Sequence, residues 1–180
     1  MKKVIIISAV VVALSYIPYN GFTQRTDRAV DIEQIDGYDQ LLLTLNHEEL
    51  DSKSIVIQVG DQNSAFIKQV GLHTANIQQV GILNTSNLVQ SGFGGQFTLY
   101  QYGELNQYNG ELNGSNIEVL ITQNGSLNTI NQQVSGDHLL SEMVQEGRQN
   151  SISHISNSLR APNLKIQQRG NNMQLIIKSN

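Results

Sequence analysis

The chain has 180 residues, a net charge of −4 and no cysteine, and only 14% of its residues are charged. Globular domains usually carry about 25% charged residues, and here Gln, Asn, Ser and Thr take their place. The mild acidity argues against nucleic-acid binding, which needs clustered Lys and Arg. Without cysteine there is no disulfide and no thiolate metal site, so stability must come from backbone hydrogen bonds and packing.

The first 23 residues have the pattern of a secretory signal peptide. Lys2 and Lys3 precede an apolar run over 4–17, and Pro18 and a short polar stretch follow. A charged start, an apolar stretch and a polar region before the cleavage site are the three parts of such a signal. The run is short for a membrane span. We therefore predict a signal peptide over 1–23 and an exported chain, with a retained anchor as the alternative.

Residues 24–53 carry much of the acidic charge and only a weak pattern. Leu41, Leu43 and Leu45 alternate with other residues, as they would in a half-buried strand. We interpret this mature N-terminal segment as either a degenerate first repeat or a flexible leader.

From Gln58 onward, full and degenerate copies of the motif Q-x-G-x-x-N alternate, and their glycines recur every ten or eleven residues. A fixed period indicates stacked copies of one small unit. Alternating apolar residues, as over 117–123, predict short half-buried strands, and the recurring glycines supply the positive φ of tight turns. Asn109-Gly110 and Asn113-Gly114 are also turn-forming dipeptides. The repeat region is predicted over 54–180, with these repeat positions: Gln58, Gly60, Asn63, Gln69, Gly71, Gln79, Gly81, Asn84, Gln90, Gly92, Gln101, Gly103, Asn106, Gln123, Gly125, Asn128, Gln145, Gly147, Asn150, Gln168 and Gly170.

Two all-β architectures fit this pattern, an antiparallel meander and a β-solenoid. In a meander, inward Gln and Asn side chains would often lack partners, at a cost of about 1–3 kcal/mol each. In a solenoid, two half-repeats make one rung of about 22 residues, and identical amides stack at about 4.8 Å and hydrogen-bond along a ladder. We therefore predict a β-solenoid with amyloid-like stacking. Asparagines 22 residues apart are expected to stack: Asn106, Asn128, Asn150 and Asn172.

The array has no recognisable polar cap. Met173, Leu175 and Ile177 share one parity of a strand that runs almost to the last residue. Repeat proteins normally close their ends with polar caps, and an open strand edge recruits further strands. The pattern predicts a molecule that can extend by adding further strands.

The best-preserved repeat reads Ser52-x5-Gln58-x-Gly60-x-x-Asn63-x-Ala65-x3-Gln69. It resembles the curlin repeat of bacterial curli, the extracellular functional amyloid of biofilms, and partial copies recur along most of the remaining chain. The irregular copies, in which Leu112 and Val134 replace Gln, resemble the minor nucleator subunit more than the major one.

This resemblance implies a secreted structural subunit of a fibre that supports biofilm matrix and cell adhesion. The implied partners are further copies of itself, other curlin subunits, and an outer-membrane secretion pore with accessory factors, at the cell surface. No cofactor and no nucleic acid are implied. A monomeric β-solenoid adhesin or binding module is the alternative.

No catalytic or metal-binding pattern accompanies the repeats. The four histidines lack metal-ligand spacing, although two of them, His73 and His154, have the inward parity of their strands. The glycines recur as turns and open no phosphate-binding helix, and Asp does not recur as a calcium repeat requires. We predict that the chain is not an enzyme and has no metal site.

Overall fold

The computed structural model describes residues 8–14, 52–157 and 163–179, within one compact unit of residues 1–16 and 51–180. Strands, and no helices, make up the regular structure of these ranges. Accordingly, they contain no helix of the length and apolarity that crossing a membrane requires. The predicted segment 24–53, apart from Ser52 and Lys53, and the break in the repeat at 160–162 lie outside the described residues.

From β2 to β9 the strands follow one another with short connections. The strands are β1 (Ser8–Leu14), β2 (Lys53–Asp61), β3 (Ser64–Ile82), β4 (Thr85–Glu104), β5 (Gln107–Leu112), β6 (Glu118–Ser126), β7 (Thr129–Gln132), β8 (Leu140–Arg148), β9 (Ser151–Ser156), β10 (Leu164–Asn171) and β11 (Gln174–Ser179).

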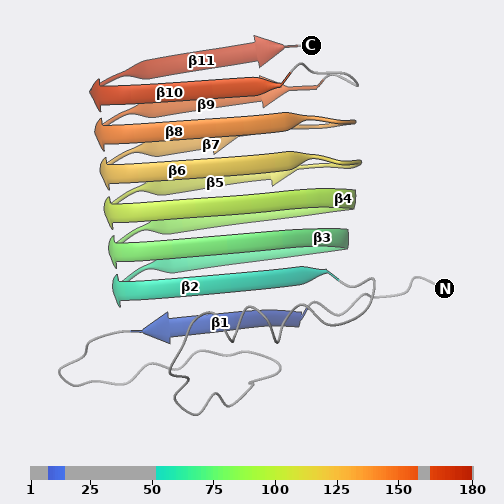
Figure 1. The fold of residues 1–180 in the computed structure, drawn as a ribbon, viewed down its shortest axis with the longest axis horizontal. Coiled ribbons are helices and arrows are strands. Elements are labelled where there is room, and N and C mark those ends of the chain that lie inside the picture. The colour runs from blue at the N-terminus through green and yellow to red at the C-terminus, as the bar shows by residue number, and fades with distance from the viewer. Residues whose placement is uncertain (1–7, 15–51, 158–162, 180) are drawn as a thin grey trace. The chain divides into compact units, whose positions relative to one another are not determined.

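Every strand pair is parallel, and the chain coils so that each turn lies on the previous one (Figure 1). The first sheet contains β1, β2, the later halves of β3 and β4, β6, β8 and β10. The second sheet contains the earlier halves of β3 and β4, β5, β7, β9 and β11. The strands β3 and β4 are long because each bends at a glycine and continues into the next sheet. One strand from each sheet makes a rung.

The predicted β-solenoid is confirmed, with about six turns of about 22 residues. The offset between stacked glutamines is 21 residues at the first rung, 22 at the middle rungs and 23 at the last. The short first turn arises where β3 bends between Leu72 and His73, since β4 has one extra residue there, Gly94.

The interior is built by the residues of one parity in each strand, as the alternation predicts. In β6, Val119, Ile121 and Gln123 are buried, and the residues between them point outward. The rings of Phe97 and Tyr108, from opposite sheets, pack inside with centroids 4.9 Å apart. The two sheets therefore enclose one narrow core along the stack.

Candidate functional site: the buried amide ladders

A column of six buried glutamines runs through all the rungs. Each Nε2 donates to the Oε1 of the glutamine on the following rung, over 2.6 to 3.0 Å. From the second rung onward, Nε2 also donates to a backbone carbonyl of the second sheet, as Gln123 does to Gln107 O at 3.0 Å. Both N–H groups of each such amide are therefore used, except in the last rung. The column consists of Gln58, Gln79, Gln101, Gln123, Gln145 and Gln168.

A column of asparagines lies at the arcs between the sheets. The Nδ2 and backbone N of Asn106 reach Asn84 Oδ1 at 3.1 and 3.2 Å, and the same Nδ2 donates to Gly125 O at 3.0 Å. Donation from amide to amide runs toward the N-terminus here, opposite to the glutamine column. Each arc is thereby bonded to the rungs on both sides. The column consists of Asn63, Asn84, Asn106, Asn128 and Asn150.

The asparagine column ends at Met173, so the prediction for Asn172 is wrong. The glutamines of the last two rungs are 23 residues apart, and this extra residue shifts the count by one. Met173 N donates to Asn150 Oδ1 at 3.2 Å, which places Met173 at the asparagine position. Asn172 has a φ of 58° and matches Gln149, whose φ is 57°. The last rung therefore lacks the amide that the others have.

The glutamines of the second half-repeat form only a short column. Gln69 Oε1 accepts a hydrogen bond from Ser54 Oγ at 2.7 Å, and Gln69 Nε2 donates to Gln90 Oε1 at 2.8 Å. Leu112 follows Gln90 in this column, because β5 pairs in register with β4. Gln90 Nε2 is consequently buried without a hydrogen-bond partner among the described residues. Such an orphaned group costs about 1–3 kcal/mol.

The repeat glycines adopt the positive φ that the sequence predicts. In the arcs that carry asparagine, φ lies between 106° and 138°. A Cβ on any of the first five would overlap the carbonyl oxygen of the glycine one rung further along. These arcs contain Gly60, Gly81, Gly103, Gly125, Gly147 and Gly170. Gly71 and Gly92, with φ of 112° and 93°, lie at the opposite bends.

The predicted turn at Asn109-Gly110 is wrong, because both residues lie inside β5. A Cβ on Gly110 would overlap the Tyr108 hydroxyl, which donates to Gln132 Oε1 at 3.0 Å. The ring of Tyr108 is completely buried, and burial raises the pKa of its hydroxyl. Glycine at this position therefore provides space for a tyrosine. The predicted Asn113-Gly114 turn does lie in a connection, between β5 and β6.

The two inward histidines are buried, as their parity predicts. Gly95 N donates to His73 Nδ1 at 3.2 Å, and His73 Nε2 lies 3.3 Å from Val70 O. These contacts suit a neutral ring with its proton on Nε2. Burial lowers the pKa of His73 and also that of His154. His154 Nδ1 has no partner within the part of the chain that the structure describes.

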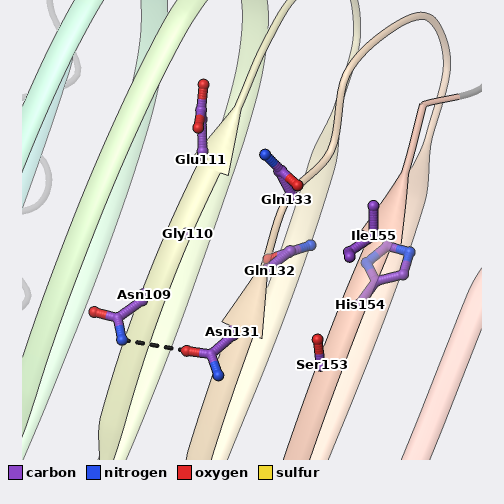
Figure 2. Close-up of a pocket in the computed structure, with 9 residues that line it drawn as sticks. All are labelled: Asn109, Gly110, Glu111, Asn131, Gln132, Gln133, Ser153, His154 and Ile155. Atoms are coloured by element: carbon purple, nitrogen blue, oxygen red, sulfur yellow. Dashed lines mark hydrogen bonds between the residues drawn. The ribbon is translucent and has the colours of Figure 1, made fainter. Parts of the chain in front are cut away.

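A surface hollow lies beside β5, β7 and β9 (Figure 2). Asn109 and Asn131 are joined along one side by a hydrogen bond of 3.2 Å, and Glu111 is the one carboxylate among its lining residues. Its only histidine, His154, is buried. Over the described ranges there is no group of three His, Cys, Asp or Glu that could hold a metal ion. The hollow offers amide hydrogen bonds and no paired acid and base.

We expect the solenoid to lose stability as the pH falls below the ordinary histidine pKa of 6.5. Because burial lowers the folded-state pKa of His73 and His154, the unfolded chain binds protons more readily. The stability is therefore complete above about pH 6.5 and declines as the pH drops toward the lowered pKa. Thermal unfolding measured between about pH 7.5 and pH 5 tests this expectation.

The control for this pH dependence is the exposed His138. Replacing both His73 and His154 with Gln should flatten the curve between about pH 6.5 and pH 5, and His138→Gln controls for the replacement of a histidine at an exposed position. An unaltered slope in the double variant would show that other groups cause the pH dependence.

Comparison of this chain with protein-family models, with curated proteins and with solved structures finds no match. The fold and the interior define its class, a parallel β-solenoid with buried glutamine and asparagine ladders.

Proposed function

We propose that this protein is a secreted structural subunit of extracellular, curli-like amyloid fibres that support biofilm matrix and cell adhesion. The observation that carries the proposal is that the first and last rungs hold corresponding positions of the same columns, with a glutamine in one column and partly buried apolar residues in others. A second copy could therefore continue the stack from either end. The further partners that the proposal includes are other curlin subunits, the outer-membrane secretion pore with its accessory factors, and the cell surface.

The glutamine column supports head-to-tail addition. In the last rung, Gln168 Nε2 donates to Ser151 O, and its second N–H has no further rung to reach among the described residues. In the first rung, Gln58 donates onward to Gln79. A copy added in register beyond β10 would place its Gln58 Oε1 against the free N–H of Gln168. The direction of donation would continue unchanged across the junction.

Apolar side chains support the same junction. The apolar residues that remain only partly buried against the core belong to the end rungs, as Ile67 and Ile177 do. Phe66 and Ile176, 55% and 69% exposed, occupy opposite ends of one outward column. The members between them are polar: Asn87, Asn109, Asn131 and Ser153. Head-to-tail stacking would cover Ile67 with Ile177 and Phe66 with Ile176, so the hydrophobic effect favours it.

The strand β1 determines whether the outer edge of β2 is free to pair with another copy. Its backbone pairs in register with β2, from Ser8 opposite Lys53 to Leu14 opposite Val59. Since β1 lies within the predicted signal peptide, removal of residues 1–23 would expose the edge of β2. The first half of β3 has no strand on that side among the described residues. Assembly of the first rung onto another copy therefore requires the processed chain.

The mismatches at the junction favour a minor or nucleating subunit over the main fibre component. Met173 offers no Oδ1 to the Asn63 of a following copy, so the asparagine column would be interrupted. Lys178 would face Lys68 across the junction, because they hold corresponding positions in the last and first rungs. Like charges on facing strands are destabilising. Both mismatches weaken the stacking of this chain on a copy of itself.

The test is assembly of the chain without residues 1–23, followed by thioflavin fluorescence, electron microscopy and fibre diffraction. We expect fibres with a reflection at about 4.8 Å. A folded protein that stays monomeric would overturn the fibre proposal and favour the adhesin. For nucleation, substoichiometric amounts are added to a curlin fibre subunit, and an unchanged lag phase would contradict that role.

A paired variant tests the end rung itself. Ile177→Asp places a charge in the inward column of β11, where a following copy would cover it, and should slow elongation at least tenfold. Ile155→Asp makes the same change at an outward position of β9, one rung inside the end and opposite Lys178 of β11, and should elongate at nearly the normal rate. Equal rates for the two variants would exclude β11 as the growing edge. Circular dichroism of the monomers checks that both fold.

A further inference from the structure

The arcs between the two sheets hold a residue in a left-handed conformation on every rung. It is the second residue after the arc glycine, with φ between 54° and 58°. These residues are Gln62, Leu83, Leu105, Leu127, Gln149 and Asn172. An L-residue pays about 1–2 kcal/mol for this conformation, and only Gly, Asn and Asp adopt it readily. Three consecutive rungs nevertheless carry leucine.

Burial of these three leucines compensates little of the cost of their left-handed conformation. Leu83 and Leu105 are 40% and 37% exposed, and Leu127 is half-buried. They lie one above another, since Leu105 N donates to Ile82 O and Leu127 N donates to Glu104 O, each at 3.0 Å. We call Leu83, Leu105 and Leu127 the leucine edge. Within one chain, asparagine would relieve the strain and lose little packing, so the leucines need another explanation.

The column beside the leucine edge carries the charges that indicate a partner. In rung order it contains Asp61, Ile82, Glu104, Ser126, Arg148 and Asn171. Asp61 and Arg148 are exposed, and neither belongs to the ion pairs of the described residues, which join Lys165 to Glu142 and Arg169 to Glu146. An acid and a base thus flank the leucines symmetrically about the rung of Leu105.

We propose that the leucine edge binds the leucine edge of a second copy of this chain, side by side and antiparallel. A two-fold axis at Leu105, perpendicular to the stack, places Leu105 against Leu105 and Leu83 against Leu127. The same axis places Asp61 against Arg148 at both ends of the contact, as an isologous interface requires. Both ion pairs then flank a continuous apolar strip.

The parallel arrangement lacks this complementarity. With the two-fold axis along the stack, the column of Asp61 and Arg148 faces the column on the other side of the leucine edge. That column is uncharged and contains Ser64, Thr85, Gln107, Thr129 and Ser151. The antiparallel pair gains two contacts of Asp61 with Arg148 against one contact between the two Glu104 side chains, so the charges favour it. This inference does not depend on head-to-tail stacking, because the contact lies on the side of the solenoid and leaves its end rungs free.

Single cysteines test the arrangement directly, because the full-length chain has none. Leu105→Cys should form a disulfide-linked dimer under mild oxidation. Leu83→Cys alone should form little, but an equal mixture of Leu83→Cys and Leu127→Cys should cross-link at least fivefold more. Leu120→Cys is the matched control, since Leu120 is 38% exposed on a different face. Cross-linking of Leu83→Cys to itself would establish a parallel pair, and no excess over the control would exclude the contact; either result overturns the proposal.

Replacement by asparagine separates docking from internal packing. Leu105→Asn should keep or raise the melting temperature, because asparagine tolerates a φ of 55°. It should weaken dimerisation at least tenfold in sedimentation. Leu120→Asn should leave dimerisation unchanged. Glu104→Gln should strengthen the pair, since the axis brings the two Glu104 side chains together, and Asp61→Asn should weaken it. Unchanged dimerisation in Leu105→Asn would overturn the proposal. The proposal would also be overturned if the chain floated with phosphatidylcholine–phosphatidylglycerol vesicles and Leu105→Asn, but not Leu120→Asn, abolished this binding.

Discussion

Replacing Gly125 with alanine is expected to destabilise the solenoid by more than about 3 kcal/mol or to prevent folding, whereas Gly114→Ala should be nearly neutral. Gly125 has a φ of 123°, a backbone conformation that L-residues with a side chain rarely adopt. A Cβ there would also overlap Gly147 O, a backbone atom fixed by the pairing of β6 with β8. Neither strand can move away without breaking the stack. The strain and the overlap act together.

Gly114 provides the matched control because it has the same repeat spacing and a different environment. A Cβ added to Gly114 would lie 3.8 Å from Gly92 Cα and 3.9 Å from Phe93 N, which are ordinary van der Waals contacts. Urea unfolding of both variants, followed by circular dichroism, gives the difference in the free energy of unfolding. A loss below about 1 kcal/mol for Gly125→Ala would mean that the arcs are adaptable.

The period and the parity were sufficient to predict the solenoid, its rung and its inward residues. They could not separate Gly125 from Gly114, since both recur at the same spacing and only the path of the adjacent rung distinguishes them. Nor could they identify Asn109-Gly110 as strand. Local turn propensity favours a bend there, but the buried ring of Tyr108 and the pairing of β5 with β4 outweigh it.

The position at which the asparagine column ends could not be predicted from the sequence, for a related reason. Counting 22 residues from Asn150 leads to Asn172, whereas one additional residue before β10 puts Met173 in that place. A repeat period fixes the register only while no residue is inserted, and an insertion in a connection leaves no trace in the strands. The left-handed leucines were likewise unpredictable, because the sequence does not reveal which arc position has a positive φ.

The second large effect is expected for Gln123→Leu, which should destabilise the solenoid by about 2–4 kcal/mol. The change deprives Gln101 Nε2 of its acceptor and Gln145 Oε1 of its donor, at 2.8 and 3.0 Å in the intact ladder. It also removes the bond from Gln123 Nε2 to Gln107 O, which joins the two sheets. Leucine has a similar volume, so the loss reports orphaned polar groups rather than a cavity.

The chain already contains one such interruption, where Leu112 follows Gln90 and leaves Gln90 Nε2 without a partner among the described residues. That interruption removes one acceptor from the end of a short column, whereas Gln123→Leu divides a column of six. Gln96→Leu is the control, because Gln96 is exposed on β4, the strand that pairs with the strand of Gln123. This change should alter the free energy of unfolding by less than about 0.5 kcal/mol. Denaturant unfolding compares the two. If Gln123→Leu and Gln96→Leu had equal free energies of unfolding, an apolar residue would stabilise the core as well as the glutamine does. The ladder would then specify the register of the rungs without adding to their stability.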